Sequence, residues 1–104
     1  MTDLHDLLDT HDSLGLADLV ARREVSSREL VDAAIDRIDE RNPTLNAVVG
    51  RRFDAARREA DAPVAGPLSG VPFLVKDLGC DVEGLQATRG SRLFADVVAT
   101  ADCE

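Results

Sequence analysis

Lysine is almost absent from this chain of 104 residues, in which Lys76 stands alone beside 11 arginines. Basic residues as a whole are few, 12 against 20 Asp and Glu, and the formal net charge is −8. Nucleic-acid surfaces carry a basic stripe and anionic membranes attract polybasic segments, so this balance argues against both kinds of partner. The acidity is typical of a solubility device or of a salt-adapted, Asp- and Arg-rich proteome.

Cysteine is also scarce, and Cys80 and Cys103 lie 23 positions apart. This spacing matches neither zinc sites nor thiol-exchange motifs, so we predict two free thiols in a reducing cytosol. His5 and His11 do not share a helical face, and solvated histidines are the favoured interpretation over a metal site. The sequence therefore predicts neither a metal nor a cofactor.

Long hydrophobic runs are missing, since no stretch approaches the roughly 18 apolar residues of a membrane-spanning helix. The first residues, 1–6, lack the positive region and apolar core of a secretory signal. The apolar fraction of 44% is ordinary for a globular protein. Together these features predict a cytoplasmic protein without membrane contact.

Helix signals dominate residues 13–60. The clearest is the capping box Ser26-Ser27-Arg28-Glu29, with Val25 and Leu30 placed as its hydrophobic staple. This helix should reach roughly Arg41 and end at Asn42-Pro43, because the residue before a proline disfavours the helical conformation. Its buried side is expected to carry Leu30, Ala34 and Ile38.

Three other helices are predicted. The first displays Leu4, Leu7 and Leu8; the second, capped by Asp12 or Ser13, displays Leu16, Leu19 and Val20; the third runs from about Arg51 to Ala60. Short strands are predicted at Leu45–Val49 and Val71–Val75, with a further one around Cys80–Val82 inside the glycine-punctuated loop 77–92. So few strands cannot form a stable sheet alone, so we expect an α/β sandwich whose other strands lie beyond residue 104.

Lys76 follows the predicted strand Val71–Val75. Arginine is effectively always protonated, whereas a desolvated lysine can lose its proton and act as a base. A lone lysine at a strand end is nevertheless usually a solvated surface charge, and only the surrounding residues change this interpretation.

Those residues resemble the N-terminal part of the amidase signature family. The resemblance is carried by Gly66-Pro-Leu-Ser-Gly-Val-Pro-Phe-Leu-Val-Lys-Asp-Leu78, then Gly84-Leu85, then Thr88-Arg89-Gly90-Ser91. Two upstream stretches also fit, residues 27–31 and 42–49, so that the similarity extends from about Leu14 to Glu104. It is specific in combination, although no single tripeptide would suffice.

The resemblance implies a large α/β/α fold with one mixed sheet and a Ser–cis-Ser–Lys triad that hydrolyses a small-molecule carboxamide. Lys76 occupies the position of the catalytic lysine. Ser69 and Ser91 match neither triad serine, and the Gly/Ser-rich stretch that carries the bridging serine is not found in these 104 residues. We therefore expect the N-terminal fragment of an amidase domain, mainly helical over 13–60, with the lysine strand and its loop at 66–92, and inactive alone.

The same resemblance makes Thr88, Gly90 and Ser91 candidates for lining the substrate pocket, although hydroxyls and glycine in such a loop also serve local turns. A carboxylate next to Lys76 would favour a charged amine, so we expect Asp77 to point elsewhere and to bond the backbone. The sequence is similar to the branch acting on aminohexanoate oligomers and less similar to the A-type subunits of amidotransferases.

Two alternatives stay open. The chain could be a non-catalytic truncated remnant or a helical interaction module, or it could belong to an amidotransferase A-type subunit that works in a complex. In either case the exposed edges of an incomplete sheet would invite self-association.

Overall fold

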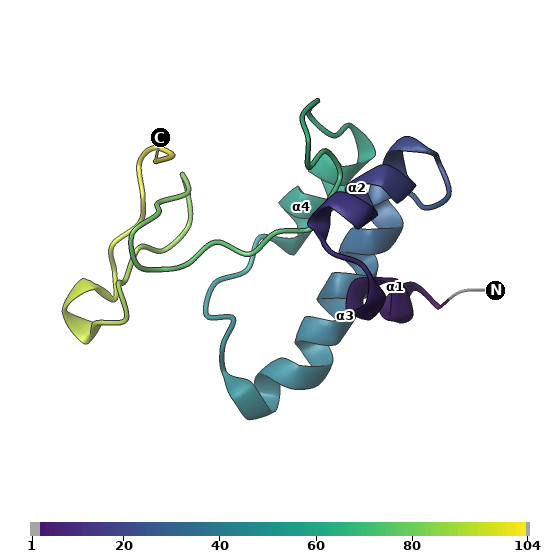
Figure 1. Cartoon of the computed structure of the whole chain (residues 1–104). Helices are drawn as coiled ribbons and strands as arrows, with labels where there is room; N and C mark the ends of the chain where they lie inside the picture. The colour runs from purple at the N-terminus through teal and green to yellow at the C-terminus, as the bar shows by residue number, and fades with distance from the viewer. Residues whose placement is uncertain (1–2, 104) are drawn as a thin grey trace. The chain divides into compact units, whose positions relative to one another are not determined.

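The computed structural model describes residues 3–103, which form four α-helices and one 3₁₀ turn (Figure 1). The elements are α1 (Leu4–Thr10), α2 (Ser13–Ala21), α3 (Ser27–Leu45), α4 (Phe53–Asp61) and η1 (Arg92–Phe94). The chain divides into two compact units. Unit 1 contains the residues up to Val48 together with Phe53–Pro72, and unit 2 contains Val49–Arg52 together with the residues from Phe73 onward. None of the helices within the described range is long and apolar enough to cross a membrane.

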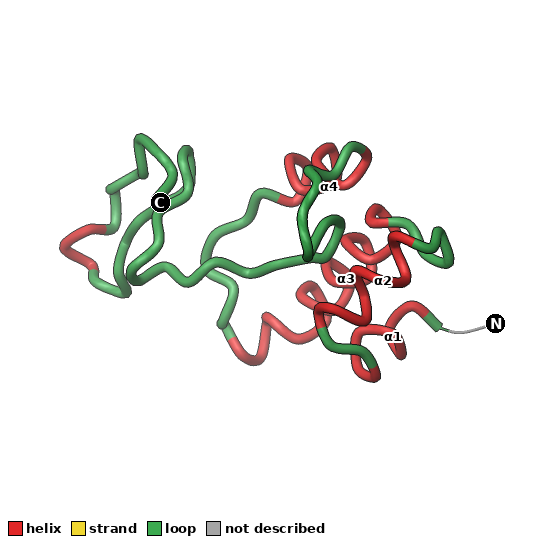
Figure 2. The backbone as a smooth tube through the Cα atoms, turned by 45° about the horizontal axis from the view of Figure 1, so that its top comes forward, coloured by secondary structure: helices red, strands yellow, loops and turns green. Residues whose placement is uncertain are grey.

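The predicted strands are not formed anywhere in residues 3–103, where Figure 2 draws only helix and loop. Residues 46–49 continue from the end of α3 without regular structure, and residues 71–76 and 80–82 are likewise irregular. A strand is stabilised by backbone hydrogen bonds to a neighbouring strand, and the described part of the chain offers only one isolated bridge, between Gln86 and Val98. Among residues 3–103 the helical half of the predicted fold is therefore present, and the first strands of its sheet are not formed.

A small apolar core holds unit 1 together. It consists of Leu16 and Leu19 from α2, Leu30 from α3, and Val25 from the connection between them. Partly buried side chains surround it: Leu4, Leu7, Leu8, Val20 and Val71. The predicted faces of α1 and α2 are thus confirmed, and both helices lie against α3 (Figure 1).

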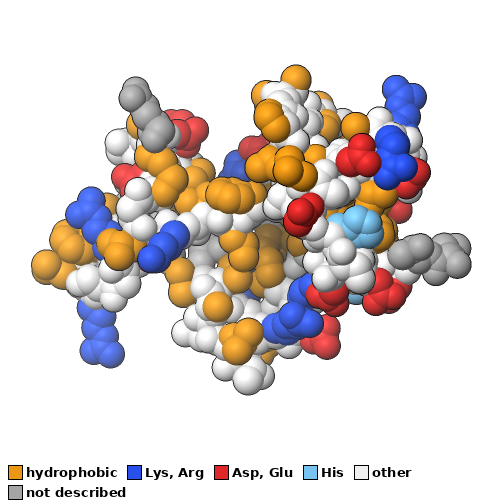
Figure 3. All heavy atoms as spheres, in the orientation of Figure 1, with side chains coloured by type: hydrophobic (Ala, Val, Ile, Leu, Met, Phe, Trp, Pro, Cys, Tyr) orange, Lys and Arg blue, Asp and Glu red, His pale blue; other side chains and the backbone are white. Residues whose placement is uncertain are grey.

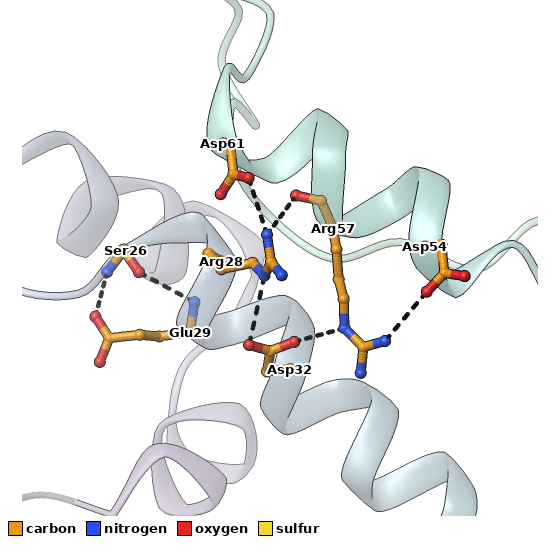
Figure 4. Close-up of polar contacts among 7 residues, drawn as sticks. All are labelled: Ser26, Arg28, Glu29, Asp32, Asp54, Arg57 and Asp61. Carbon is orange, nitrogen blue, oxygen red and sulfur yellow. Dashed lines mark hydrogen bonds and ion pairs between the residues drawn. The ribbon is translucent and has the colours of Figure 1, made fainter.

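The N-terminus of α3 has the predicted capping box, drawn in Figure 4. Ser26 Oγ accepts the Glu29 N–H at 3.0 Å, and Glu29 Oε1 accepts the Ser26 N–H at 3.1 Å. Val25 and Leu30 are both buried, as a hydrophobic staple requires. These bonds satisfy backbone donors that the first turn of a helix leaves unpaired.

The buried side of α3 differs from the predicted one. Leu30 is fully buried, but Ala34 and Ile38 are only half-buried, and the stripe continues through Ala33 and Ile35. Steps of four residues drift around a helix of 3.6 residues per turn, so a contact surface that follows the helix also uses steps of three and five.

The end of α3 lies beyond the predicted one, because the helix passes through Pro43 to Leu45. Asn46 then closes it in the left-handed conformation, with φ of 48°, and donates its N–H to the Asn42 carbonyl at 2.7 Å. The Asn42 side chain is bonded twice to the Val48 backbone, at 2.9 Å in each direction. The Asn42 side chain therefore holds the chain segment that follows the helix.

The loop after α4 is held against the helices of unit 1 at Gly70. The buried Ser27 hydroxyl donates to the Gly70 carbonyl at 2.8 Å. Gly70 has φ of +82°, and a Cβ there would come within 2.9 Å of a Val20 methyl. Both the backbone conformation and the close approach thus require glycine at this position.

Helix α4 is joined to α3 by ion pairs (Figure 4). Arg57 Nε lies 2.9 Å from Asp32, and Arg28 Nη1 lies 2.9 Å from Asp61. Arg57 also reaches Asp54, one turn away on its own helix, at 3.5 Å. The hydrogen bond to Asp32 raises the pKa of Arg57, with desolvation opposing this and the charges of Asp32 and Asp54 adding to it.

We predict that Ser26→Ala lowers the free energy of unfolding of unit 1 by about 1 kcal/mol, because the Glu29 N–H loses its acceptor. Urea unfolding followed by circular dichroism measures the change. Ser13→Ala is the matched control, since Asp12 and not Ser13 caps α2. Equal stabilities of the two variants would contradict the role of the cap.

Candidate functional site

Two antiparallel segments form the frame of unit 2. The backbone of residues 81–87 pairs with that of residues 97–103, and Ala87 and Ala99 are buried between them. The connecting hydrogen bonds are Ala87 N–H to Val97 O, Ala99 N–H to Leu85 O, Gly84 N–H to Ala99 O and Cys103 N–H to Asp81 O, all of 2.9–3.0 Å. Residues 88–96 make the loop at the closed end.

A disulfide between Cys80 and Cys103 closes the other end of this frame. The two Cα atoms are 5.7 Å apart, within the usual range for a disulfide. The prediction of two free thiols is therefore wrong. Sequence spacing could not reveal the pairing, because it depends on the antiparallel contact that brings residue 103 beside residue 81.

The loop Thr88-Arg89-Gly90-Ser91 is a tight turn in which the Ser91 N–H donates to the Thr88 carbonyl at 2.9 Å. Arg89 and Gly90 have φ of 53° and 69°, a combination found in type I′ turns and easy for glycine at the second position. Ser91 Oγ accepts the Leu93 N–H and so caps η1. The Arg89 guanidinium lies over the Phe94 ring, 5.4 Å from its centroid.

Asp77 joins this turn to the segment that carries Lys76. One carboxylate oxygen accepts the Thr88 N–H at 2.9 Å, and the other accepts the Thr88 hydroxyl. The expectation that Asp77 bonds the backbone is confirmed. Thr88 is therefore engaged in local structure through both its hydroxyl and its N–H.

These bonds affect the titration of Asp77. The Thr88 hydroxyl, followed by the Thr88 N–H, holds the pKa of the Asp77 carboxyl below its ordinary value of 3.8, with desolvation opposing them and the N–H groups of Gly90 and Arg89 helping. A lowered pKa in the folded state means that the bonds stabilise unit 2 above pH 3.8. That contribution is lost as the pH falls through the folded-state pKa.

Lys76 itself is exposed and makes no hydrogen bond or ion pair with another residue of the described range. The predicted burial at a strand end is thus not provided by residues 3–103. The structure brings Lys76, Thr88, Gly90 and Ser91 into one unit and links the lysine segment to the turn through Asp77.

The other candidate residues do not come together to form a site within the described part of the chain. Over residues 3–103, no three His, Cys, Asp or Glu side chains are placed to hold a metal ion. The His5 carbonyl accepts a bond from Arg37, and the His11 ring contacts the Thr10 hydroxyl at 3.0 Å. A shallow hollow of about 330 Å³ lies in unit 1 between α2 and the loop 66–69, and Lys76 does not line it.

Unit 2 exposes many large apolar side chains, and Figure 3 shows hydrophobic groups at the surface of the face that it draws. Phe73 is 83% exposed and Leu74 66% exposed, immediately before Lys76. The others are Val75, Leu78, Leu93, Val97 and Val98. An apolar segment that flanks the candidate base therefore lacks a covering layer among residues 3–103.

Comparison with known proteins identifies the class. The profile of the amidase family matches residues 29–104, so the chain belongs to this family. The solved structure of a 6-aminohexanoate cyclic dimer hydrolase aligns with a TM-score of 0.70 and 38% identity, over 85% of this chain and 17% of that one.

Two curated relatives show the breadth of the family. The A-type subunit of the glutamyl-tRNA(Gln) amidotransferase from Azoarcus sp. (strain BH72) is 47% identical over 77% of this chain and 18% of its own length. The acylamidase of Rhodococcus erythropolis is 37% identical over 84% of this chain and 20% of its own length. The chain thus spans about a fifth of these relatives, and the identities do not favour the aminohexanoate branch over the amidotransferases.

We predict that replacing both cysteines, in Cys80→Ser with Cys103→Ser, destabilises unit 2 by about 3 kcal/mol, because the disulfide closes a loop of 23 residues. Hydrogen exchange of the amides of residues 84, 87 and 99 reports this locally. Added reductant should reproduce the effect in the wild type and change nothing in the double variant. Two thiols that react with a thiol reagent in the native protein would contradict the pairing.

Proposed function

We propose that this chain supplies the lysine base of a serine-nucleophile amidase that hydrolyses a carboxamide C–N bond through a Ser–cis-Ser–Lys triad. The observation that carries the proposal is the place of Lys76. It is the chain's one lysine, it stands in the Gly66–Asp77 pattern, and it lies within the residues that match the amidase family. The names of two relatives, an acylamidase and a 6-aminohexanoate cyclic dimer hydrolase, also support a hydrolase of this kind.

In this mechanism a neutral Lys76 amine takes a proton from the bridging serine, which takes one from the nucleophilic serine. The nucleophile then forms a bond to the amide carbonyl carbon, and the C–N bond breaks as the proton returns to the leaving nitrogen. Water subsequently releases the carboxylic acid. A neutral amine requires desolvation, which a layer over the apolar residues 73–75 would provide.

Thr88, Gly90 and Ser91 are proposed to support the substrate pocket. Their observed bonds favour an indirect contribution, because Thr88 and Ser91 use their hydroxyls within the loop and Gly90 provides backbone geometry. A rigid turn next to the base can still shape the position of an acyl group. The proposed partner is a small amide substrate. The disulfide favours an oxidising compartment over the cytoplasmic setting that the sequence predicts.

Two other functions have specific support. The 47% identity to the A-type subunit of an amidotransferase favours a role in which ammonia from an amide is passed on within a complex. The exposed, unpaired Lys76 of residues 3–103 fits a non-catalytic remnant or helical interaction module. The coding DNA beyond the codon for Glu104 separates an amidase from a remnant, because only an open frame that carries the Gly/Ser-rich stretch can complete the triad.

We predict that Lys76→Ala abolishes amide hydrolysis in the protein translated from the complete open reading frame, with little loss of folding. Lys76→Arg should fail as well, because arginine cannot serve as a neutral base. Release of ammonia from a simple amide such as benzamide measures turnover, and Arg92→Ala is a surface control. Near-normal turnover of the alanine variant would remove Lys76 from the mechanism.

We predict that residues 1–104 alone have no amidase activity and are marginally ordered, because a base without its serines and oxyanion donors is not a functional unit. The sequence predicts self-association through sheet edges, but the described residues form no sheet. Exposed apolar side chains such as Phe73 and Leu74 would drive it instead. Light scattering and circular dichroism test the order. A monodisperse, cooperatively melting monomer, or turnover that disappears on Lys76→Ala, would contradict the prediction.

A further inference from the structure

The carboxylate of Asp77 makes its hydrogen bonds to one turn, residues 88–91. It accepts both the N–H and the hydroxyl of Thr88, and the N–H groups of Arg89 and Gly90 also favour its charged form. The contact joins residues 11 positions apart within unit 2. Among residues 3–103 no side-chain bond holds the candidate base Lys76 in place, so its backbone is the part of the residue that the described contacts can position.

We infer that Asp77 is the positioning residue of Lys76, fixing the lysine backbone to the turn 88–91 through its bonds to Thr88. The inference rests on the proposed function for its catalytic meaning. Residues 76 and 77 share a planar peptide unit, so a carboxylate anchored at residue 77 also limits the movement of the Lys76 carbonyl group. The same anchor limits the distance between the backbone of the base and the loop proposed to support the substrate.

Charge makes Asp77 better suited to this role than a neutral residue. Hydrogen bonds to an ionised acceptor are roughly twice as strong as neutral ones, and two acceptor oxygens define an orientation as well as a distance. The bonds also occupy the carboxylate that stands next to the amine in sequence. Asparagine at this position would retain one acceptor and would turn the other group into a donor facing the Thr88 region.

Nuclear magnetic resonance of the protein translated from the complete open reading frame tests the geometry. The amide signals of residues 88–90 should show one transition below pH 3.8 in the wild type, absent in Asp77→Asn. Thr88→Val should move it upward, because the hydroxyl is the largest cause of the lowered pKa, whereas Thr88→Ser should keep it low. The backbone N–H of Lys76 should become more mobile in Asp77→Asn and remain unchanged in the control Asp96→Asn. An equally rigid Lys76 in all variants, or no transition in the wild type, would overturn the inference.

The kinetic test uses the protein translated from the complete open reading frame. Asp77→Asn should lower kcat about a hundredfold with little change in KM, since misplacement of a catalytic group by about 1 Å has that effect. An inactive Lys76→Ala beside an Asp77→Asn of normal kcat would overturn the positioning role and leave the proposed function standing. An active Lys76→Ala would contradict the proposed function. The magnetic resonance result would then test only whether Asp77 fixes the backbone of Lys76 to the turn.

Discussion

Backbone N–H and C=O groups need partners, and this requirement decides which parts of the chain acquire regular structure. In residues 4–45 the need is met locally, because helices satisfy their own backbone and the capping box at Ser26 completes the first turn of α3. The Leu30 side chain can then be fully buried against α2. Residues 71–76 have a strand-like sequence but no neighbouring strand among the described residues, so they remain irregular. The difference between the helical unit 1 and the irregular unit 2 follows from this requirement.

In unit 1, ion pairs between helices add to the small apolar core. The α3–α4 contact uses Arg28 and Arg57 against Asp32 and Asp61, and the side chains involved are one third to three fifths exposed. Exposed pairs are individually weak and are screened by salt. Their value here lies in geometry, since Arg28 and Arg57 share Asp32 between two helices and so hold α4 in one orientation along α3 (Figure 4).

Local signals in the sequence predicted the helical unit well. The cap at Ser26, the staple of Val25 and Leu30, and the faces of α1 and α2 were all evident, because each depends on residues within two turns. Features that depend on distant residues were missed. The disulfide needs the antiparallel contact of residues 81–87 with 97–103, and the path of the chain after α3 depends on the bonds between the Asn42 side chain and Val48. The predicted strands also depend on distant residues, which must supply partners for their backbone hydrogen bonds, and they are not formed among residues 3–103.

The candidate site likewise combines features that the sequence predicted with a contact that only the structure shows. The pattern around Lys76 pointed to a base, and Asp77 was recognised as a backbone-bonding residue, but its partner Thr88 could be found only in the structure. That partner matters for the chemistry. A carboxylate within about 4–6 Å of an amine favours the charged amine, which would oppose a neutral base. The Asp77 carboxylate is directed at the turn by its two bonds from Thr88, and it makes no ion pair with Lys76. Asp77 therefore anchors the loop, while the neighbouring Lys76, the proposed base, makes no hydrogen bond or ion pair among the described residues.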